Sequence, residues 1–110
     1  MLLEFIDPGK LRIPLELQQI VDVADGQGGI TRSYSTLANV YGHINPVGSR
    51  RTNRGHGDEV TTTHRIIVRY RTDIAPDQRF ISNNRSFDIQ TVRDLDESQR
   101  FLLCECVEIV

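Results

Sequence analysis

The residues best suited to chemistry in this 110-residue chain are cations in a glycine-rich segment. Arg50, Arg51 and Arg54 are followed by His56, and no acidic residue precedes Asp58 in this segment. Guanidinium groups pair with phosphate oxygens in two-point contacts, so one hypothesis is a phosphate-binding segment. The alternative is a solvated loop whose charges bind nothing in particular. Taken alone, three arginines favour the solvated loop.

Histidine and cysteine are the other residue types that could build a site. His43, His56 and His64 together with Cys104 and Cys106 match no spacing of a zinc motif, so no metal site is predicted. His64 falls on a strand face and is predicted to be packed or interfacial. Cys104 and Cys106 lie two apart on a predicted strand and share a face, where a disulfide between them would strain the backbone. We expect reduced, at least partly buried thiols.

No group of residues predicts catalysis or a cofactor. Ser, His and Asp occur, but without the strand-to-helix elbow that presents a nucleophile. The glycines of residues 26–29 lack the lysine and the spacing of a nucleotide-binding loop and are typical of a hairpin turn. Asp94, Asp96 and Glu97 predict a solvated acidic turn rather than a cation site. The chain is therefore predicted not to be an enzyme.

Alternation with a period of two residues dominates the chain and determines how these residues are positioned. It predicts six strands, over residues 11–23, 30–44, 60–71, 79–82, 86–92 and 101–110. Pro14 lacks an N–H and predicts a sheet edge or a bulge in the first strand. Asn83 and Asn84 predict a tight hairpin. The segment 37–41 also fits one helical turn, so a short helix there stays open.

Six short strands with intervening turns predict an all-β fold, a small antiparallel barrel, with a sandwich as the alternative. The length suits a single domain, residues 1–110. The exception to the alternation is an inserted loop at about residues 45–59, which carries the arginines and hardly any apolar side chain. A loop this long in so small a domain is typical of a functional or disordered segment, and we expect it to be mobile in an isolated subunit.

The overall charge argues against a general nucleic-acid coat. The net charge is −2, although twelve of the thirteen basic residues are arginine, a residue suited to interfaces. The apolar start of the chain is interrupted by Asp7, Pro8 and Gly9, too early for a signal sequence or a membrane span. We therefore expect a protein that stays in the cytoplasm of the cell that makes it and has no membrane partner.

The order of landmarks resembles the phage head–tail joining family, the head-closure or stopper connectors, over nearly the whole chain. The likeness is carried by segments 9–12, 25–29, 40–44, 63–71, 84–89 and 102–106, and is strongest in Thr63-His64-Arg65-Ile66-Ile67-Val68-Arg69-Tyr70-Arg71. One departure is the arginine- and glycine-rich stretch 48–57, where family members often carry a more helical segment.

This resemblance implies a virion protein located in the neck between head and tail. It implies a ring of six or twelve copies, with a portal or adaptor ring on the head side and a tail terminator or tail tube on the other. Arg50, Arg51, Arg54 and His56 would then face packaged double-stranded DNA in the channel or a neighbouring ring. The alternatives are another neck ring, either an adaptor or a tail terminator, and a stand-alone nucleic-acid-binding barrel of the OB or SH3-like kind.

Overall fold

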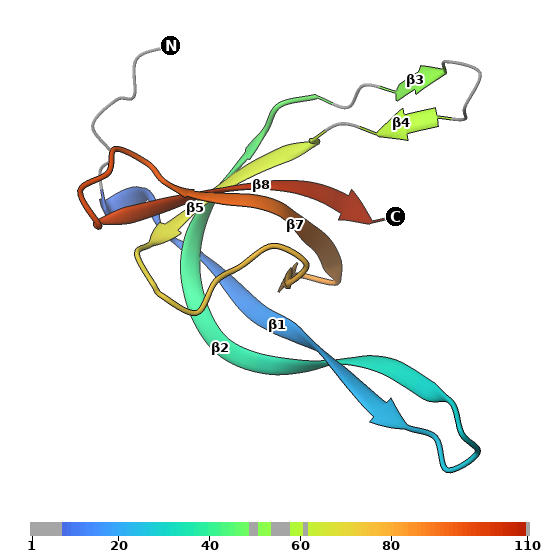
Figure 1. The fold of residues 1–110 in the computed structure, drawn as a ribbon. Coiled ribbons are helices and arrows are strands. Elements are labelled where there is room, and N and C mark those ends of the chain that lie inside the picture. Colours follow the sequence, from blue (N-terminus) through green and yellow to red (C-terminus); the bar gives the residue numbers. More distant parts are fainter. Residues whose placement is uncertain (1–7, 49–50, 54–57, 61, 110) are drawn as a thin grey trace.

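The computed structural model describes residues 8–48 and 62–109, together with the backbone of 51–53 and 58–60. Its elements are a short 3₁₀ helix and eight strands: η1 (Pro8–Lys10), β1 (Ile13–Ala24), β2 (Ile30–Pro46), β3 (Arg51–Asn53), β4 (Asp58–Val60), β5 (His64–Arg69), β6 (Arg79–Ser82), β7 (Arg85–Asp94) and β8 (Phe101–Ile109). Six of the strands close into a barrel in the order β1-β2-β5-β8-β7-β6, with antiparallel neighbours throughout. The predicted all-β barrel is confirmed (Figure 1).

The backbone decides two local alternatives, a helical turn against a strand at residues 37–41 and a sheet edge against a bulge at Pro14. The segment 37–41 is part of β2, so the helical alternative is wrong. The register passes from Leu17 opposite Ala38 to Gln18 opposite Thr36, which leaves Leu37 as the extra residue of a bulge. This bulge explains why apolar residues in β2 depart from strict alternation. Pro14 pairs with Tyr41 of β2, whereas the pairing of β1 with β6 covers only residues 16–18, so the proline lies at a local sheet edge.

The hairpin turns follow from residues that tolerate positive φ. Asn83 and Asn84 adopt φ of 50° and 65° between β6 and β7, as predicted for a tight turn. Between β1 and β2, the Asp25 carboxylate accepts hydrogen bonds from the amides of Gln27 and Gly29 at 2.8 and 3.0 Å. These bonds lower the pKa of Asp25 and stabilise the turn.

The core occupies the interior of the barrel. Its largest fully buried side chains are Phe80 and Phe87, surrounded by alternate residues of β1, β5, β7 and β8. A smaller cluster lies on the outer face of β8, where Phe101 and Leu103 of this strand pack with Leu95. β8 is therefore buried on both faces near its start, which accounts for its unbroken apolar run. Cys104 and Cys106 are free thiols with no exposed surface, so their predicted burial is confirmed.

The predicted inserted loop contains regular structure. Residues 51–53 and 58–60 form the antiparallel strands β3 and β4, with Arg51 opposite Val60 and Asn53 opposite Asp58. The predicted strand at 60–71 is accordingly shorter than expected and begins at His64, because Val60 belongs to the ribbon. Within the segment expected to be a loop, 45–59, residues 51–53 and 58–59 are therefore strand, and residues 45–46 belong to the end of β2. Short strands of this kind carry little alternation to reveal them.

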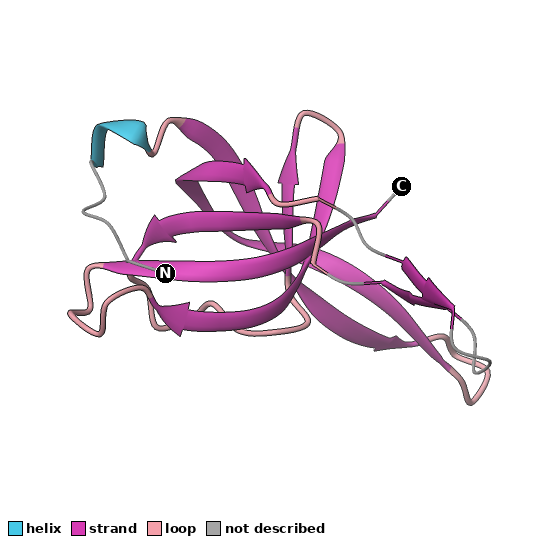
Figure 2. Cartoon of the chain, turned by 90° about the horizontal axis from the view of Figure 1, so that it is seen from above, coloured by secondary structure: helices cyan, strands magenta, loops and turns pink. Residues whose placement is uncertain are grey.

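Two ribbons project from the barrel. In Figure 1 the β1–β2 hairpin extends downward to the right and the β3–β4 ribbon upward to the right, while η1 lies on the left. Figure 2 shows the same arrangement from above, with strands dominating the molecule. None of the described residues forms a helix long and apolar enough to cross a membrane.

Candidate functional site

The predicted phosphate-binding residues fall on and around the β3–β4 ribbon. Arg51 begins β3, and its backbone pairs with Val60 of β4. Arg50, Arg54 and His56 lie outside the described residues. The sequence-based hypothesis for these four side chains therefore stays a prediction, and the structure adds the shape and attachment of the segment that carries them.

The ribbon is attached to the barrel through a short paired root. Pro46 at the end of β2 lies opposite His64 at the start of β5. The Val47 amide then donates a 3.0 Å hydrogen bond to the Thr63 carbonyl. Gly48 follows with φ of +87°, a backbone conformation that favours glycine. The root therefore holds the two connections to the ribbon side by side.

Thr63 fastens this root to the C-terminal strand. Its amide donates a 2.9 Å hydrogen bond to the Cys106 carbonyl, and its Oγ1 accepts one of 2.8 Å from the Glu108 amide. These bonds extend the β5–β8 pairing beyond its first pair, His64 opposite Cys106. The base of the ribbon is thus hydrogen-bonded to β2 on one side and to β8 on the other.

A buried histidine lies directly beneath the root. The ring of His64 meets Phe87 edge-on with 5.0 Å between ring centroids, and its Nδ1 is hydrogen-bonded to Thr63 Oγ1 at 2.9 Å. Its Nε2 lies 3.9 Å from a carboxylate oxygen of Glu108. The residue is 9% exposed, so the prediction of a packed histidine is confirmed.

An ion pair covers the histidine on the outside. Arg85 donates from Nε and from a terminal nitrogen to the two oxygens of Glu108, at 2.9 and 3.1 Å. These hydrogen bonds lower the pKa of Glu108 and raise that of Arg85. Arg85 also lies over the Phe87 ring at 4.9 Å. Sequence reasoning missed this pair, because its partners are 23 residues apart and only the β7–β8 pairing brings them together.

Several other titratable groups in the described part of the chain are engaged in local hydrogen bonds or are buried. There, no three His, Cys, Asp or Glu residues gather in a geometry that could hold a metal ion. In the acidic turn, Asp94 accepts from the amides of Ser98 and Gln99, and Asp96 accepts from Arg100 at 2.8 Å. Burial raises the pKa of Cys104 to about 12, which keeps its thiol protonated and unreactive near neutrality.

A family model described as phage head completion protein matches residues 6–109 of the chain. Among proteins with curated descriptions, the chain has no significant match.

Two solved structures share the fold. A chain in the virion of a native gene transfer agent particle is 26% identical with a TM-score of 0.66, over 88% of this chain and 94% of that one. Protein SF1141 from Shigella flexneri 2a, solved in solution, is 22% identical with a TM-score of 0.69, over 94% of this chain and 96% of that one. The likeness covers nearly the whole of both chains in each case.

Proposed function

The chain belongs to the phage head completion protein family, and from this premise we propose that it is a structural ring component of the neck of a phage-like particle. As a stopper, the ring joins the portal or adaptor ring on the head side to the tail terminator or tail tube, and it helps to retain packaged DNA. The observation that carries the proposal is the family match over residues 6–109. The likeness to a chain of a gene transfer agent virion supports it.

The β3–β4 ribbon is the part of the chain that we assign to the channel. Its root is hydrogen-bonded to β2 and to β8, so the ribbon has a defined attachment from which to reach a neighbour or DNA. Arg50, Arg51, Arg54 and His56 supply donors and positive charge for phosphate oxygens. In a ring of six or twelve copies, these charges repeat around one axis and their fields add, although each chain has a net charge of only −2.

The role is structural rather than catalytic. The buried histidine and the Arg85–Glu108 pair are engaged in packing and in hydrogen bonds within the barrel. Their placement under the root suits them to stiffening the ribbon's attachment. The protein accordingly acts by position and by contact within the particle.

Replacing Arg50, Arg51 and Arg54 together with serine tests the proposal. We expect particles with lower DNA retention and poorer tail attachment, because the charge at the channel is lost. The free energy of unfolding should change by no more than about 0.5 kcal/mol, since exposed charges contribute little to stability. DNA content and tailed fraction of purified particles, measured beside a thermal melt, give the answer.

A charge-matched control separates position from total charge. Arg65, Arg93 and Arg100 are exposed arginines on the barrel and its acidic turn. Their triple replacement with serine removes the same charge and should leave DNA retention intact. Equal loss in both variants, or full particles with tails from the first, would contradict the proposed role of the ribbon. Imaging of the neck that finds a single copy, or a copy away from the particle axis, would contradict the ring itself.

A further inference from the structure

The β1–β2 hairpin extends beyond the barrel as a two-stranded arm, which comprises residues 19–35. Among the described strands, these two pair only with each other here, because β6 pairs with β1 no further than Gln18 and β5 pairs with β2 only from Gly42 onward. Six residues per strand give the arm a length of roughly 20 Å. A two-stranded ribbon alone in water is marginal, so an arm of this length is suited to packing against another surface.

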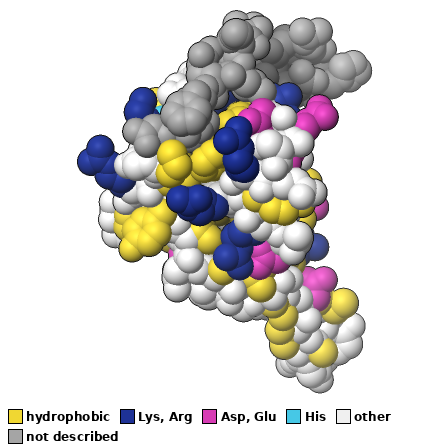
Figure 3. Space-filling view, turned by 90° about the vertical axis from the view of Figure 1, so that its left-hand side faces the viewer, with side chains coloured by type: hydrophobic (Ala, Val, Ile, Leu, Met, Phe, Trp, Pro, Cys, Tyr) yellow, Lys and Arg dark blue, Asp and Glu magenta, His cyan; other side chains and the backbone are white. Residues whose placement is uncertain are grey.

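The arm continues the apolar face of the core into solvent. Alternate residues of β1 share a face, and the bulge lies on β2, so Val21 and Val23 follow Leu15 and Leu17 on the inward side. Leu17 has no exposed surface, whereas Val23 is 50% exposed. On the other face of the ribbon, Ile30 lies opposite Ala24 at the tip and is 72% exposed. Figure 3 shows hydrophobic side chains along the arm, at the lower right. The alternation typical of a half-buried strand thus continues into the arm, where neither β1 nor β2 pairs with a further described strand.

The charge of the arm is acidic. Asp22 and Asp25 are opposed by Arg32 alone, and Arg32 pairs with Asp22 through a long, exposed contact of 3.5 Å. Such a contact contributes little and leaves the Asp22 carboxylate open to a further partner. A surface that receives this arm should therefore be apolar and basic.

A groove with that chemistry lies on the opposite side of the molecule. It has a volume of about 420 Å³ and is lined by η1, β2 and the end of β5, including Leu11, Tyr41 and Tyr70. Tyr41 is 63% exposed. Arg69 and Arg71 also line it, and of these Arg71 is held by Asp73 through two hydrogen bonds of 2.9 and 2.8 Å. Arg69 makes no ion pair within the described residues. Figure 3 shows basic and hydrophobic side chains interspersed over this face.

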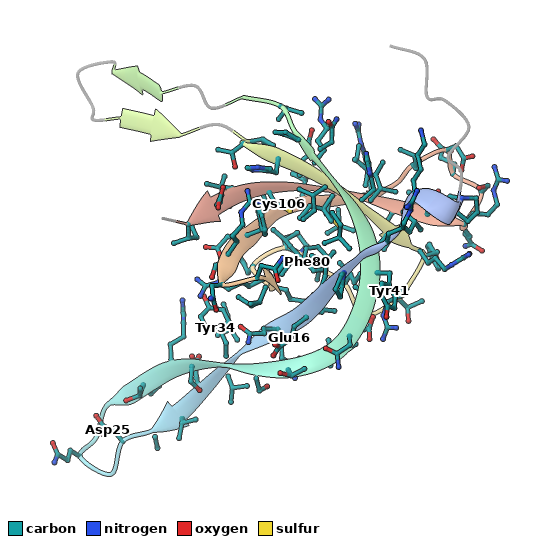
Figure 4. The ribbon with its side chains drawn as sticks, turned by 180° about the vertical axis from the view of Figure 1, so that it is seen from behind. Glu16, Asp25, Tyr34, Tyr41, Phe80 and Cys106 are labelled. Carbon is teal, nitrogen blue, oxygen red and sulfur yellow. The ribbon has the colours of Figure 1, made fainter. Side chains whose placement is uncertain are left out.

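The arm and the groove cannot meet within one chain. Figure 4 places Asp25 at the far end of the arm and Tyr41 on the other side of the barrel. Two complementary surfaces at opposite ends of a molecule make a heterologous, head-to-tail contact between copies, and such contacts close into a ring when the rotation permits. A two-fold dimer would instead require each surface to complement itself.

We propose that the arm of each copy docks into the groove between η1, β2 and β5 of the next copy around the ring. Ile30 at the tip packs near Tyr41 and Tyr70 of that copy, and Asp22, on the same face of the ribbon, lies near its Arg69. This inference rests on the ring proposed above and identifies its subunit contact. The contact buries Ile30 and gives Arg69, which makes no ion pair within the described residues, an acidic partner.

Crosslinking in assembled particles tests the contact with engineered cysteines. Thr31 on the arm and Asn39 in the groove are exposed, and both can be replaced with cysteine without removing the proposed anchors. They lie eight residues apart on one strand, on the order of 25 Å, which a short bismaleimide cannot span within a chain. Cys104 and Cys106 have no exposed surface and will not compete.

The double variant Thr31→Cys/Asn39→Cys should give a ladder of multimers on a denaturing gel. The matched control Thr31→Cys/Gln90→Cys, with its second thiol on exposed β7, should stay monomeric. Rings seen by imaging that yield no ladder would overturn the arm contact and leave the proposed function standing. A single copy per particle would overturn both. Dimers from Thr31→Cys alone would show arms meeting arms, which also overturns the proposal.

Charge reversal in the groove supplies a second readout. Arg69→Glu places an acid opposite Asp22 and should lower incorporation into particles roughly tenfold or more, with an unchanged melt. Arg93→Glu is the matched control, because Arg93 is exposed and makes no ion pair within the described residues. Normal incorporation of the Arg69→Glu protein would contradict the placement of the arm.

Discussion

Gly42 illustrates how one residue determines the packing of the barrel wall. A Cβ at this position would lie 2.6 Å from Leu15 Cδ1, 3.0 Å from the Ile67 carbonyl oxygen and 3.1 Å from Val68 Cγ1. The reason for glycine here is lack of space, since its φ is ordinary for a strand. The close approach lets β2 lie against the core where Leu15 fills the interior.

We expect Gly42→Ala to lower the free energy of unfolding by about 1–3 kcal/mol, as overpacking of a core does. The midpoint of thermal unfolding should fall by at least about 5 °C. Asn39→Ala, on the exposed side of the same strand, is the control and should be close to neutral. Leu15→Val should cost less in the Gly42→Ala background than in the parent chain, because it shortens the side chain nearest the new methyl. Additive costs would show that the strain lies elsewhere.

At the scale of elements, Arg79 joins the base of the arm to the hairpin of β6 and β7. Its Nε donates a 2.7 Å hydrogen bond to Asp88 of β7, and its guanidinium lies 4.0 Å from the centroid of the Tyr34 ring on β2. Asp88 and Tyr34 therefore hold the Arg79 side chain from two strands. The side chains of Arg79 and Asp88 are only 22% and 31% exposed. The arm leaves the barrel directly after this contact (Figure 4).

We expect Arg79→Ala to cost about 1–2 kcal/mol of stability, combining the lost cation–π contact and ion pair. The stability of Arg79→Lys should lie between those of the parent chain and of Arg79→Ala. Lysine keeps the charge but lacks the planar group that stacks on Tyr34 and pairs with Asp88 at the same time. Amide hydrogen exchange in residues 30–35 should accelerate in both variants. Arg93→Ala serves as the control, and unchanged exchange in the arm of Arg79→Ala would refute the anchoring role.

The strands could be predicted from the sequence more completely than the contacts between them. Period-2 alternation located all six barrel strands, and the asparagine pair located the β6–β7 turn. Alternation cannot show where a strand leaves its sheet, so it did not distinguish the arm from the rest of β1 and β2. The groove and the Arg85–Glu108 pair depend on strands that are distant in sequence. Composition alone marked the arginine-rich segment, and it could not reveal the two three-residue strands there.

For the whole molecule, the charges predict how stability depends on pH. Hydrogen bonds lower the pKa of five carboxyls spread over the turns and the barrel wall: Glu16, Asp25, Asp73, Asp96 and Glu108. A group with a lowered folded pKa contributes stability above its unfolded pKa, and this contribution is lost as pH falls through the folded value. Stability should therefore decline below about pH 4, near the ordinary pKa of Asp and Glu.

The alkaline side depends on the two buried thiols. Burial raises the pKa of Cys104 to about 12 and raises that of Cys106 as well. The unfolded chain then releases these protons at a lower pH than the folded chain does. Stability is fully present below the unfolded thiol pKa of about 8.5 and falls as pH rises above it. In this range, ionisation of each thiol in the unfolded chain can lower the free energy of unfolding by up to about 1.4 kcal/mol per pH unit.

Urea unfolding between pH 2 and pH 10 should accordingly give a plateau from about pH 5 to 8 with a decline on each side. The variant Cys104→Ala/Cys106→Ala should be less stable at pH 7, because it removes buried volume, yet show a flatter alkaline decline. Glu108→Gln should leave the alkaline side unchanged and shrink the acidic decline, because one of its titrating groups is gone. An alkaline decline of equal slope with and without the thiols would place its origin in other groups. Both cysteines lie on β8, between β5 and β7. Such a result would therefore mean that their burial in the barrel is not the source of this pH dependence.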